Sequence, residues 1–260
     1  MIRGDEIMLL DIYVISLLFL AGLFLGMIFI MYGIKGPLKT KLTAGYCAEC
    51  NSSYEWYEMI PIVSYFLMRG KCSHCNKSLS PLLPMLELLS GLLFSFSYII
   101  YGFRYEMFIM IILTLLLVNV YVSDFKYFII LDKPLFWMSV VVLILKFCFF
   151  GLKTFLISIC SGLLLFLFMM LIRFVGNKIF KEESLGGGDI KLAVFFGFVL
   201  GLRLSIVTLV LGSFLAFPYA IYLALTNGKK EIPFGPFLLS GLYLVFIFMD
   251  VVNNFLSIIF

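Results

Sequence analysis

Long apolar runs, separated by short polar segments, set the pattern of this chain. A helix needs about 20 apolar residues to cross the roughly 30 Å hydrocarbon core of a bilayer. Runs of this kind predict about eight transmembrane helices, at 8–33, 82–102, 106–123, 134–150, 152–175, 190–202, 204–226 and 236–257. The sixth run is shorter than the others. We therefore expect an all-α, polytopic membrane helix bundle.

The composition agrees with a membrane protein. Of the 260 residues, 63% are hydrophobic and 13% are charged, whereas soluble domains average about 45–50% apolar and about 25% charged residues. The first apolar run is too long for a cleavable signal peptide, and it has neither a basic start nor a small-residue cleavage site. We expect this run to be a permanent helix.

Lysine and arginine indicate the orientation of the helices, because cytoplasmic loops carry an excess of both residues. If the loop 34–81 is cytosolic and the spans alternate, fourteen of the 19 basic residues fall on the cytosolic side. This imbalance predicts an even number of spans with both termini outside. The net charge of +4 then reflects membrane topology, and we expect no nucleic acid as a partner.

The polar loop 34–81 contains two C-x2-C pairs, which are separated by twenty-one residues. They are Cys47 with Cys50 and Cys72 with Cys75. Four thiolates at such spacing can bind one tetrahedral zinc ion, which stabilises a loop too small to form a core. Two disulfides, or four thiols without a role, are the alternatives, although a cytosolic loop disfavours disulfides. We expect a small zinc-binding loop domain, with His74 as a bystander.

A triple glycine followed by an aspartate, Gly186 to Asp189, begins the short sixth run. Asp is a favoured helix N-cap and glycine is a common loop residue, so the pattern has an ordinary explanation. Three glycines also leave backbone without side chains, against which another chain can lie in extended form. Carboxylates near a membrane core are costly and mostly functional. Asp189 is therefore a candidate functional residue.

Asp124, at the cytosolic end of the third run, is the candidate partner. The predicted orientation puts Asp124 and Asp189 at the same membrane face. Two neighbouring carboxylates do not both ionise easily, so such a pair holds one proton. The ionised member can take a proton from water while the protonated member polarises a peptide carbonyl, as in aspartic proteases. The alternative is two unrelated carboxylates at helix ends.

Three segments, in order, resemble the bacterial type IV prepilin peptidases, which are membrane aspartic proteases of the G-x-G-D class. GGGDIKL is similar to the motif that carries the second catalytic aspartate, which implies this role for Asp189. SDFKYFIILD is similar to the segment that carries the first, at Asp124, with Asp132 as a further acidic residue. The cysteine loop, including Arg69 and Glu87, also resembles that of the family. The resemblance covers most of the chain.

The resemblance divides the chain into an amino-terminal region, 1–103, with the cysteine loop, and a peptidase domain, 104–260. It implies a multi-pass protein of the bacterial inner membrane that acts at the cytosolic face. Its substrates would be type IV prepilins or pseudopilins, which have a basic leader and a membrane-embedded apolar helix. The bond to be cleaved would lie in an extended segment along Gly186, Gly187 and Gly188.

Charged residues near the aspartates are further candidates for substrate binding. Glu182 and Glu183, together with Asp132, could attract the basic leader, or they could be solvated loop charges. Lys191 could hold Asp189 ionised, or its side chain could extend to the membrane interface. We assign these four charged residues to the substrate site.

The resemblance also implies a second activity, methylation of the new amino terminus with S-adenosylmethionine. The cysteine loop region would bind this cofactor, with Glu58, Arg69 and Glu87 as candidate residues. Glu58 and Arg69 could instead be solvated loop charges, and Glu87 could pair with a nearby lysine. The chain departs from the family pattern after the first run and before Pro84, and Leu131 stands where the family usually has proline. These departures weigh against methylation, whereas the protease motifs are intact.

Two other classes of function are the alternatives. Interrupted helices with carboxylates also occur in proton-coupled transporters, but the chain has no internal repeat and both aspartates fall near one face. A non-catalytic membrane protein of pilus assembly is disfavoured by the intact aspartate motifs. A zinc protease is disfavoured because the sequence has no H-E-x-x-H motif and only one histidine, and four cysteine ligands would leave the metal no open position. The oligomeric state is left open.

Overall fold

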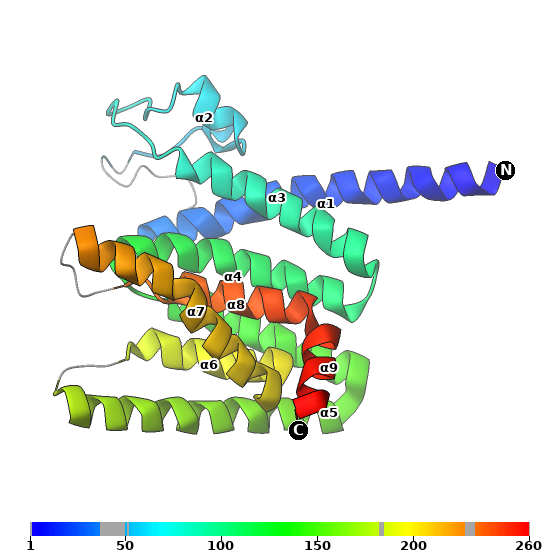
Figure 1. Ribbon diagram of the computed structural model, residues 1–260. Coiled ribbons are helices and arrows are strands. Elements are labelled where there is room, and N and C mark those ends of the chain that lie inside the picture. Colours follow the sequence, from blue (N-terminus) through cyan, green and yellow to red (C-terminus); the bar gives the residue numbers. More distant parts are fainter. Residues whose placement is uncertain (1, 37–49, 51, 182–184, 227–231, 260) are drawn as a thin grey trace. The chain divides into compact units, whose positions relative to one another are not determined.

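The computed structural model describes residues 2–36, 50, 52–181, 185–226 and 232–259. These residues form helices and connecting turns without any β-strand, which confirms the predicted all-α class. The chain divides into two compact units, Met1–Val122 and Ser123–Phe260, both drawn in Figure 1. The boundary falls inside helix α4 (Tyr105–Tyr127), whose last turn belongs to the second unit.

The first unit consists of apolar helices and a loop with little regular structure. Its elements are α1 (Ile2–Lys35), η1 (Trp56–Met59), α2 (Val63–Leu67), α3 (Leu82–Tyr101) and most of α4. α1 and α3 pack against each other (Figure 1). A Cβ atom on Gly22 would lie 2.8 Å from the Cα atom of Gly91, and Ser90 Oγ donates to the Gly22 carbonyl at 2.8 Å. Small residues thus let the two backbones approach, as is common between membrane helices.

The second unit contains the last turn of α4 and the helices that follow it. They are α5 (Asp132–Phe180), α6 (Gly187–Leu200), α7 (Leu202–Thr226), α8 (Gly235–Ile247) and α9 (Met249–Ile259). α6 lies along α5 (Figure 1), and a Cβ atom on Gly197 would lie 2.6 Å from the Cα atom of Gly162. This close contact fixes the helix that carries Asp189 against α5.

The described helices match the predicted number of eight spans only roughly. Five of them are long and apolar enough to cross a bilayer, or six if α8 and α9 count as one span. The predicted runs 134–150 and 152–175 both lie within α5, which is broken at Gly151, where φ is 77°. The run 190–202 corresponds to α6, whose 14 residues are too few to qualify. The run 236–257 corresponds to α8 and α9, which are bent by 81°.

Candidate active site and metal-binding loop

The glycine run lies at the start of α6. Gly186 is the N-cap, with an extended backbone, and Asp189 is the third residue of the helix. The Asp189 carboxylate accepts a hydrogen bond from the Gly186 N–H, which is the return contact that a carboxylate makes in a capping box. The alternative explanation of Asp189 as an N-cap is therefore wrong. Its side chain is held toward the beginning of the helix.

Asp124 lies in the last turn of α4 and is buried, with an exposed fraction of 6%. Its Oδ2 atom accepts a hydrogen bond of 2.9 Å from the backbone N–H of Gly235. Gly235 begins α8 and is followed by Pro236. The sequence-based prediction did not include Gly235, although a proline in the first turn marks a helix start.

Asp124 and Asp189 come close enough to interact electrostatically. Burial, and after it the negative charge of Asp124, raise the pKa of the Asp189 carboxyl group to about 7, and the hydrogen bond from Gly186 opposes this rise. Two carboxyl groups that interact in this way can hold a single proton near neutral pH. The arrangement can therefore present one acidic and one basic carboxyl group at the same site.

The three glycines differ in the space around them. A Cβ atom on Gly188 would lie 3.1 Å from the side chain of Ile130, which is a tight contact. On Gly187, such an atom would lie 3.9 Å from Arg173 Nη1, an ordinary contact distance. Gly186 and Gly187 are exposed, so backbone without side chains borders the carboxylates. Neither Ile130 nor Arg173 was among the predicted site residues.

Lys191 and Asp132 form an ion pair in the same unit. The distance from Lys191 Nζ to Asp132 Oδ1 is 2.6 Å, and both side chains are more than half exposed. The lysine is thus paired with Asp132 and not, as one interpretation had it, with Asp189. Glu182 and Glu183 lie outside the described residues.

Three of the four predicted metal ligands come together in the first unit. The sulfur atoms of Cys50, Cys72 and Cys75 all lie within 4.8 Å of one another, and those of Cys50 and Cys72 are 3.9 Å apart. Tetrahedral zinc–thiolate bonds of about 2.3 Å would separate two sulfurs by roughly 3.8 Å. None of the three forms a disulfide, so that alternative is wrong for them, and the group could hold a metal ion. Cys47 lies outside the described residues.

Hydrogen bonds join the second cysteine pair to the rest of its loop. Glu58, with an exposed fraction of 3%, is buried in η1. Its carboxylate accepts the N–H of Glu55 at 2.8 Å and the hydroxyl of Ser73, which lies between Cys72 and Cys75 in the sequence. The interpretation of Glu58 as a solvated charge is therefore wrong. Ser73 was not predicted, because its sequence context is that of an ordinary loop serine.

Glu87 connects the same loop to α3. Its Oε2 atom accepts the N–H of Ile62 at 2.7 Å, so the carboxylate binds backbone where a lysine partner was the predicted alternative. Ile62 has a φ of 63°, which is rare for a β-branched residue. The hydrogen bond that its N–H donates to Glu87 helps to hold this backbone conformation. Glu87 is buried, whereas Arg69 is exposed.

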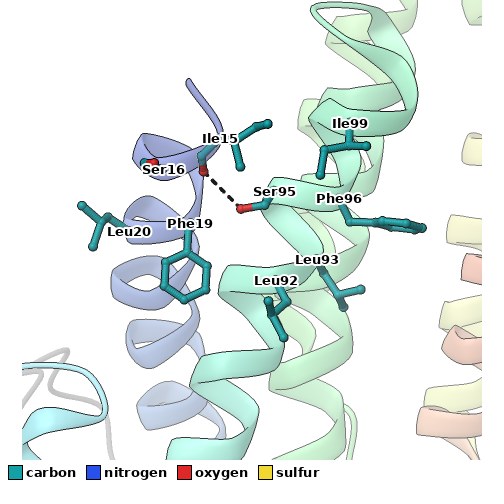
Figure 2. A pocket seen from close by; sticks show the side chains of 9 residues that line it. All are labelled: Ile15, Ser16, Phe19, Leu20, Leu92, Leu93, Ser95, Phe96 and Ile99. Atoms are coloured by element: carbon teal, nitrogen blue, oxygen red, sulfur yellow. Dashed lines mark hydrogen bonds between the residues drawn. The ribbon is translucent and has the colours of Figure 1, made fainter. Parts of the chain in front are cut away.

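Figure 2 shows a groove between α1 and α3, with a volume of about 840 Å³. Its lining is almost entirely apolar, with Phe19 and Phe96 among the larger side chains. The hydroxyl of Ser95 donates to the Ile15 carbonyl at 3.1 Å, so this polar group is satisfied within the helix pair. None of the predicted site residues lines the groove.

Two family models match the chain. Residues 20–101 match the bacterial peptidase A24 N-terminal domain, and residues 109–221 match the type IV leader peptidase family. Together these stretches take up more than half of the 260 residues. The chain belongs to the type IV leader peptidase family. It is a membrane peptidase, and its apolar helices make it a multi-pass protein.

Curated relatives carry the name prepilin leader peptidase/N-methyltransferase. That of Bacillus subtilis is 27% identical over 246 residues, which are 93% of this chain and 97% of the relative. That of Myxococcus xanthus is 29% identical over 214 residues, 82% of this chain and 64% of the relative. That of Vibrio cholerae is 27% identical over 212 residues, 77% of this chain and 79% of the relative. No solved structure matches the chain.

Proposed function

We propose that the chain is an aspartic endopeptidase that removes the basic leader from type IV prepilins or pseudopilins. The observation that carries the proposal is the approach of the Asp124 and Asp189 carboxylates, each of which accepts a backbone N–H. The name of the relatives supports prepilins as the substrate class. The distribution of lysine and arginine supports an active site at the cytosolic face of the bacterial inner membrane.

In the proposed reaction the dyad supplies both the acid and the base. Ionised Asp124 takes a proton from a water molecule, whose oxygen atom attacks the carbonyl carbon of the scissile bond. Asp189 carries the shared proton and donates it to the carbonyl oxygen. When the intermediate collapses, the C–N bond breaks and the leaving amine takes the proton held by Asp124. A hydroxyl proton of the intermediate returns to Asp189, which restores the dyad.

The glycine run supports binding of the substrate in extended form. A helix resists proteolysis because its backbone is already hydrogen-bonded, so the cleavable segment is the extended chain that precedes the apolar helix of the substrate. Gly186 and Gly187 expose backbone beside the dyad, and this backbone can accept such a segment. The basic leader would compete with Lys191 for Asp132, with Glu182 and Glu183 as further acidic contacts.

Co-expression with a candidate prepilin tests this function. Leader removal is followed by the gel shift of the prepilin, for the wild type and for Asp189→Asn. The asparagine is nearly isosteric, so the variant should fold and insert, yet it cannot hold the shared proton and should not cleave. Asp132→Asn is the comparison and should retain part of the cleavage, because Asp132 is exposed, is paired with Lys191 and is assigned to the leader and not to the chemical step. Full cleavage by Asp189→Asn would reject the dyad.

We further propose that the cysteine loop binds a structural zinc ion, with Cys47 as the fourth ligand. The three described thiols, all within 4.8 Å of one another, support a bound metal ion, and a fourth thiolate from Cys47 would leave no open position, as in structural zinc sites. Metal analysis of the purified protein should find about one zinc per chain, and Cys72→Ser should lose it. Cys160→Ser, in α5, is the control and should keep it. A wild-type protein with no metal and four thiols that react readily would reject the site.

Methylation of the new amino terminus is the second proposed activity, and the name of the relatives favours it. S-adenosylmethionine would supply the methyl group. The exposed guanidinium of Arg69 can bind a cofactor carboxylate through two hydrogen bonds. Glu58 and Glu87 remain candidates for the same region, although their bonds within the loop support a role in shaping it.

Mass spectrometry of the processed pilin tests the second activity. With the cofactor present, the new terminus should gain the mass of one methyl group. Arg69→Met should lose this increment while leader removal continues, and the exposed neighbour variant Lys71→Met should keep it. An unmodified terminus in the wild type would reject methylation without affecting the peptidase assignment.

A further inference from the structure

The carboxyl-terminal helix α9 departs from the direction of α8. The two helices are bent by 81° at Phe248, and Figure 1 shows α9, in red, running across the end of α8. The sequence predicted a single span over 236–257. The bend ends that crossing at Phe248, because the residues of α9 advance little along the axis of α8.

Three stripes of residues run along α9. One is half-buried toward α7 and α8, which α9 contacts, and consists of Met249, Val252 and Leu256. The second is apolar and exposed: Val251, Phe255 and Ile258 have exposed fractions of 64%, 61% and 83%. The third is polar and exposed, and consists of Asp250, Asn253, Asn254 and Ser257.

This combination suits neither water nor hydrocarbon alone. In hydrocarbon, the carboxylate and amides of the polar stripe would lose their hydrogen bonds to water. In water, the three large side chains of the apolar stripe would remain exposed. Both stripes are satisfied at the boundary between headgroups and acyl chains, where amphipathic helices lie in the membrane plane.

We propose that α9 is an interfacial helix that binds the surface of the bilayer through Val251, Phe255 and Ile258. This apolar stripe continues the exposed apolar surface at Phe248, which is 54% exposed, and that of the membrane helix α7. Three side chains are far fewer than the roughly 20–30 residues that each partner contributes to a stable protein interface. α9 contains no lysine or arginine, so the contact does not depend on anionic lipid.

Binding of α9 to the bilayer surface would also affect the peptidase, a consequence that rests on the proposed function. α8 has 13 residues and is therefore about 20 Å long, which is less than the roughly 30 Å of the bilayer core. If α9 lies at the far interface, the length of α8 sets how far Gly235, and the Asp124 carboxylate that accepts its N–H, lie from that interface. α9 thereby sets the depth of the dyad.

Tryptophan fluorescence in vesicles of phosphatidylcholine tests the position of α9. The full chain, with Trp56→Phe and Trp137→Phe to remove the native signals, carries either Phe255→Trp or Asn254→Trp. The indole of Phe255→Trp should be quenched at least roughly twofold more by lipid brominated near the headgroup than by lipid brominated at the chain ends. The indole of Asn254→Trp should be quenched by aqueous acrylamide instead.

Other outcomes of this experiment would overturn the proposal. Stronger quenching by chain-end bromine would mean that α9 crosses the bilayer. Absence of quenching by either lipid would mean that the apolar stripe faces water or protein. If the indole becomes harder to quench as the protein-to-lipid ratio rises, the stripe contacts a second copy of the chain. These results leave the dyad untouched, so they are distinguishable from a failure of the peptidase assignment.

A matched pair of charge variants tests the link to depth. Phe255→Asp puts a charge into the apolar stripe and should lower the cleavage rate several-fold in vesicles. Asn254→Asp puts the same charge into the polar stripe and should leave the rate unchanged. Equal cleavage rates for both variants would mean that α9 does not set the depth of the dyad.

Discussion

Buried carboxylates occur in both units, and their surroundings differ. In the cysteine loop, Glu58 accepts two donors from its own loop, and Glu87 accepts the N–H of Ile62. These carboxylates face donors. In the second unit, Asp124 and Asp189 each accept one backbone N–H, and the charge of Asp124 adds to burial in raising the pKa of Asp189.

The difference separates Glu58, whose carboxylate accepts two donors of its own loop, from Asp189, which has a second carboxylate nearby. Donors around an ionised group stabilise its charge and leave it chemically inert. A like charge beside it favours the protonated form, which is the form a general acid needs near neutral pH. Burial alone therefore does not identify a catalytic carboxylate in this chain, and the nearby charge of Asp124 is what distinguishes Asp189.

The largest expected effect is the loss of cleavage in Asp124→Asn. The variant should cleave a prepilin about 10²–10⁴-fold more slowly, because the amide cannot take a proton from water. Its unfolding temperature should stay close to that of the wild type, since the amide oxygen still accepts the Gly235 N–H. Initial rates and thermal unfolding of the purified protein measure both quantities. Glu58→Gln is the matched variant and should retain most of the cleavage rate. If Glu58→Gln lost cleavage and Asp124→Asn kept it, the distinction between the two kinds of carboxylate would be wrong.

The second prediction concerns pH. The pKa of Asp189 is raised to about 7, so below this value the carboxyl group is protonated and above it the dyad loses its shared proton. The cleavage rate should therefore fall about tenfold per pH unit above that value. Single-turnover rates across a pH series measure this limb. A rate that stays constant well into alkaline solution would mean that the shared proton takes no part.

Much of the site followed from short-range sequence signals. The apolar runs predicted the helices, and the glycine run with its aspartate predicted the start of α6. The donor to Asp124 could not be predicted in the same way, because Gly235 is brought to it by the packing of α8 and not by a neighbouring motif. In the cysteine loop, the bond from Ser73 to Glu58 could not be predicted either, since a serine between two cysteines has many possible partners.

The helix count shows where a one-dimensional pattern loses information. The prediction of runs 134–150 and 152–175 as separate helical segments agrees with α5, whose backbone is not helical at Gly151 and in which Lys146 Nζ lies 3.0 Å from Ser158 Oγ across that break. A run of 22 residues at 236–257, in contrast, contains two helices at a steep angle. Hydropathy indicates whether a segment is stable in the membrane, but it does not give the direction of the helix axis. The polar stripe of α9 was visible in the sequence, but its exposure follows only from how α9 packs.

The third prediction sharpens the role of Glu58. Glu58→Ala removes the acceptor for Glu55 N–H and for the Ser73 hydroxyl, and should lower the free energy of unfolding by about 2 kcal/mol. Glu58→Gln should lose much less, because its amide oxygen can accept the N–H and its amide nitrogen can donate to Ser73. Chemical unfolding, together with zinc retention against a chelator, distinguishes the two variants. Equal loss in both would mean that the charge matters beyond these two bonds.

The smallest effect is expected at the glycine run, where neighbouring positions differ in space. Gly188→Ala puts a methyl group 3.1 Å from the side chain of Ile130, so the start of α6 must shift slightly and carry Asp189 with it. The cleavage rate should fall roughly tenfold or less, since small displacements of a catalytic group lower the rate sharply. Gly187→Ala has only an ordinary contact to Arg173, so it should keep kcat near the wild-type value and raise KM, because its methyl group meets the substrate backbone. Adding Ile130→Ala to Gly188→Ala should restore cleavage in part; if it does not, the glycine is required for the substrate backbone and not for packing.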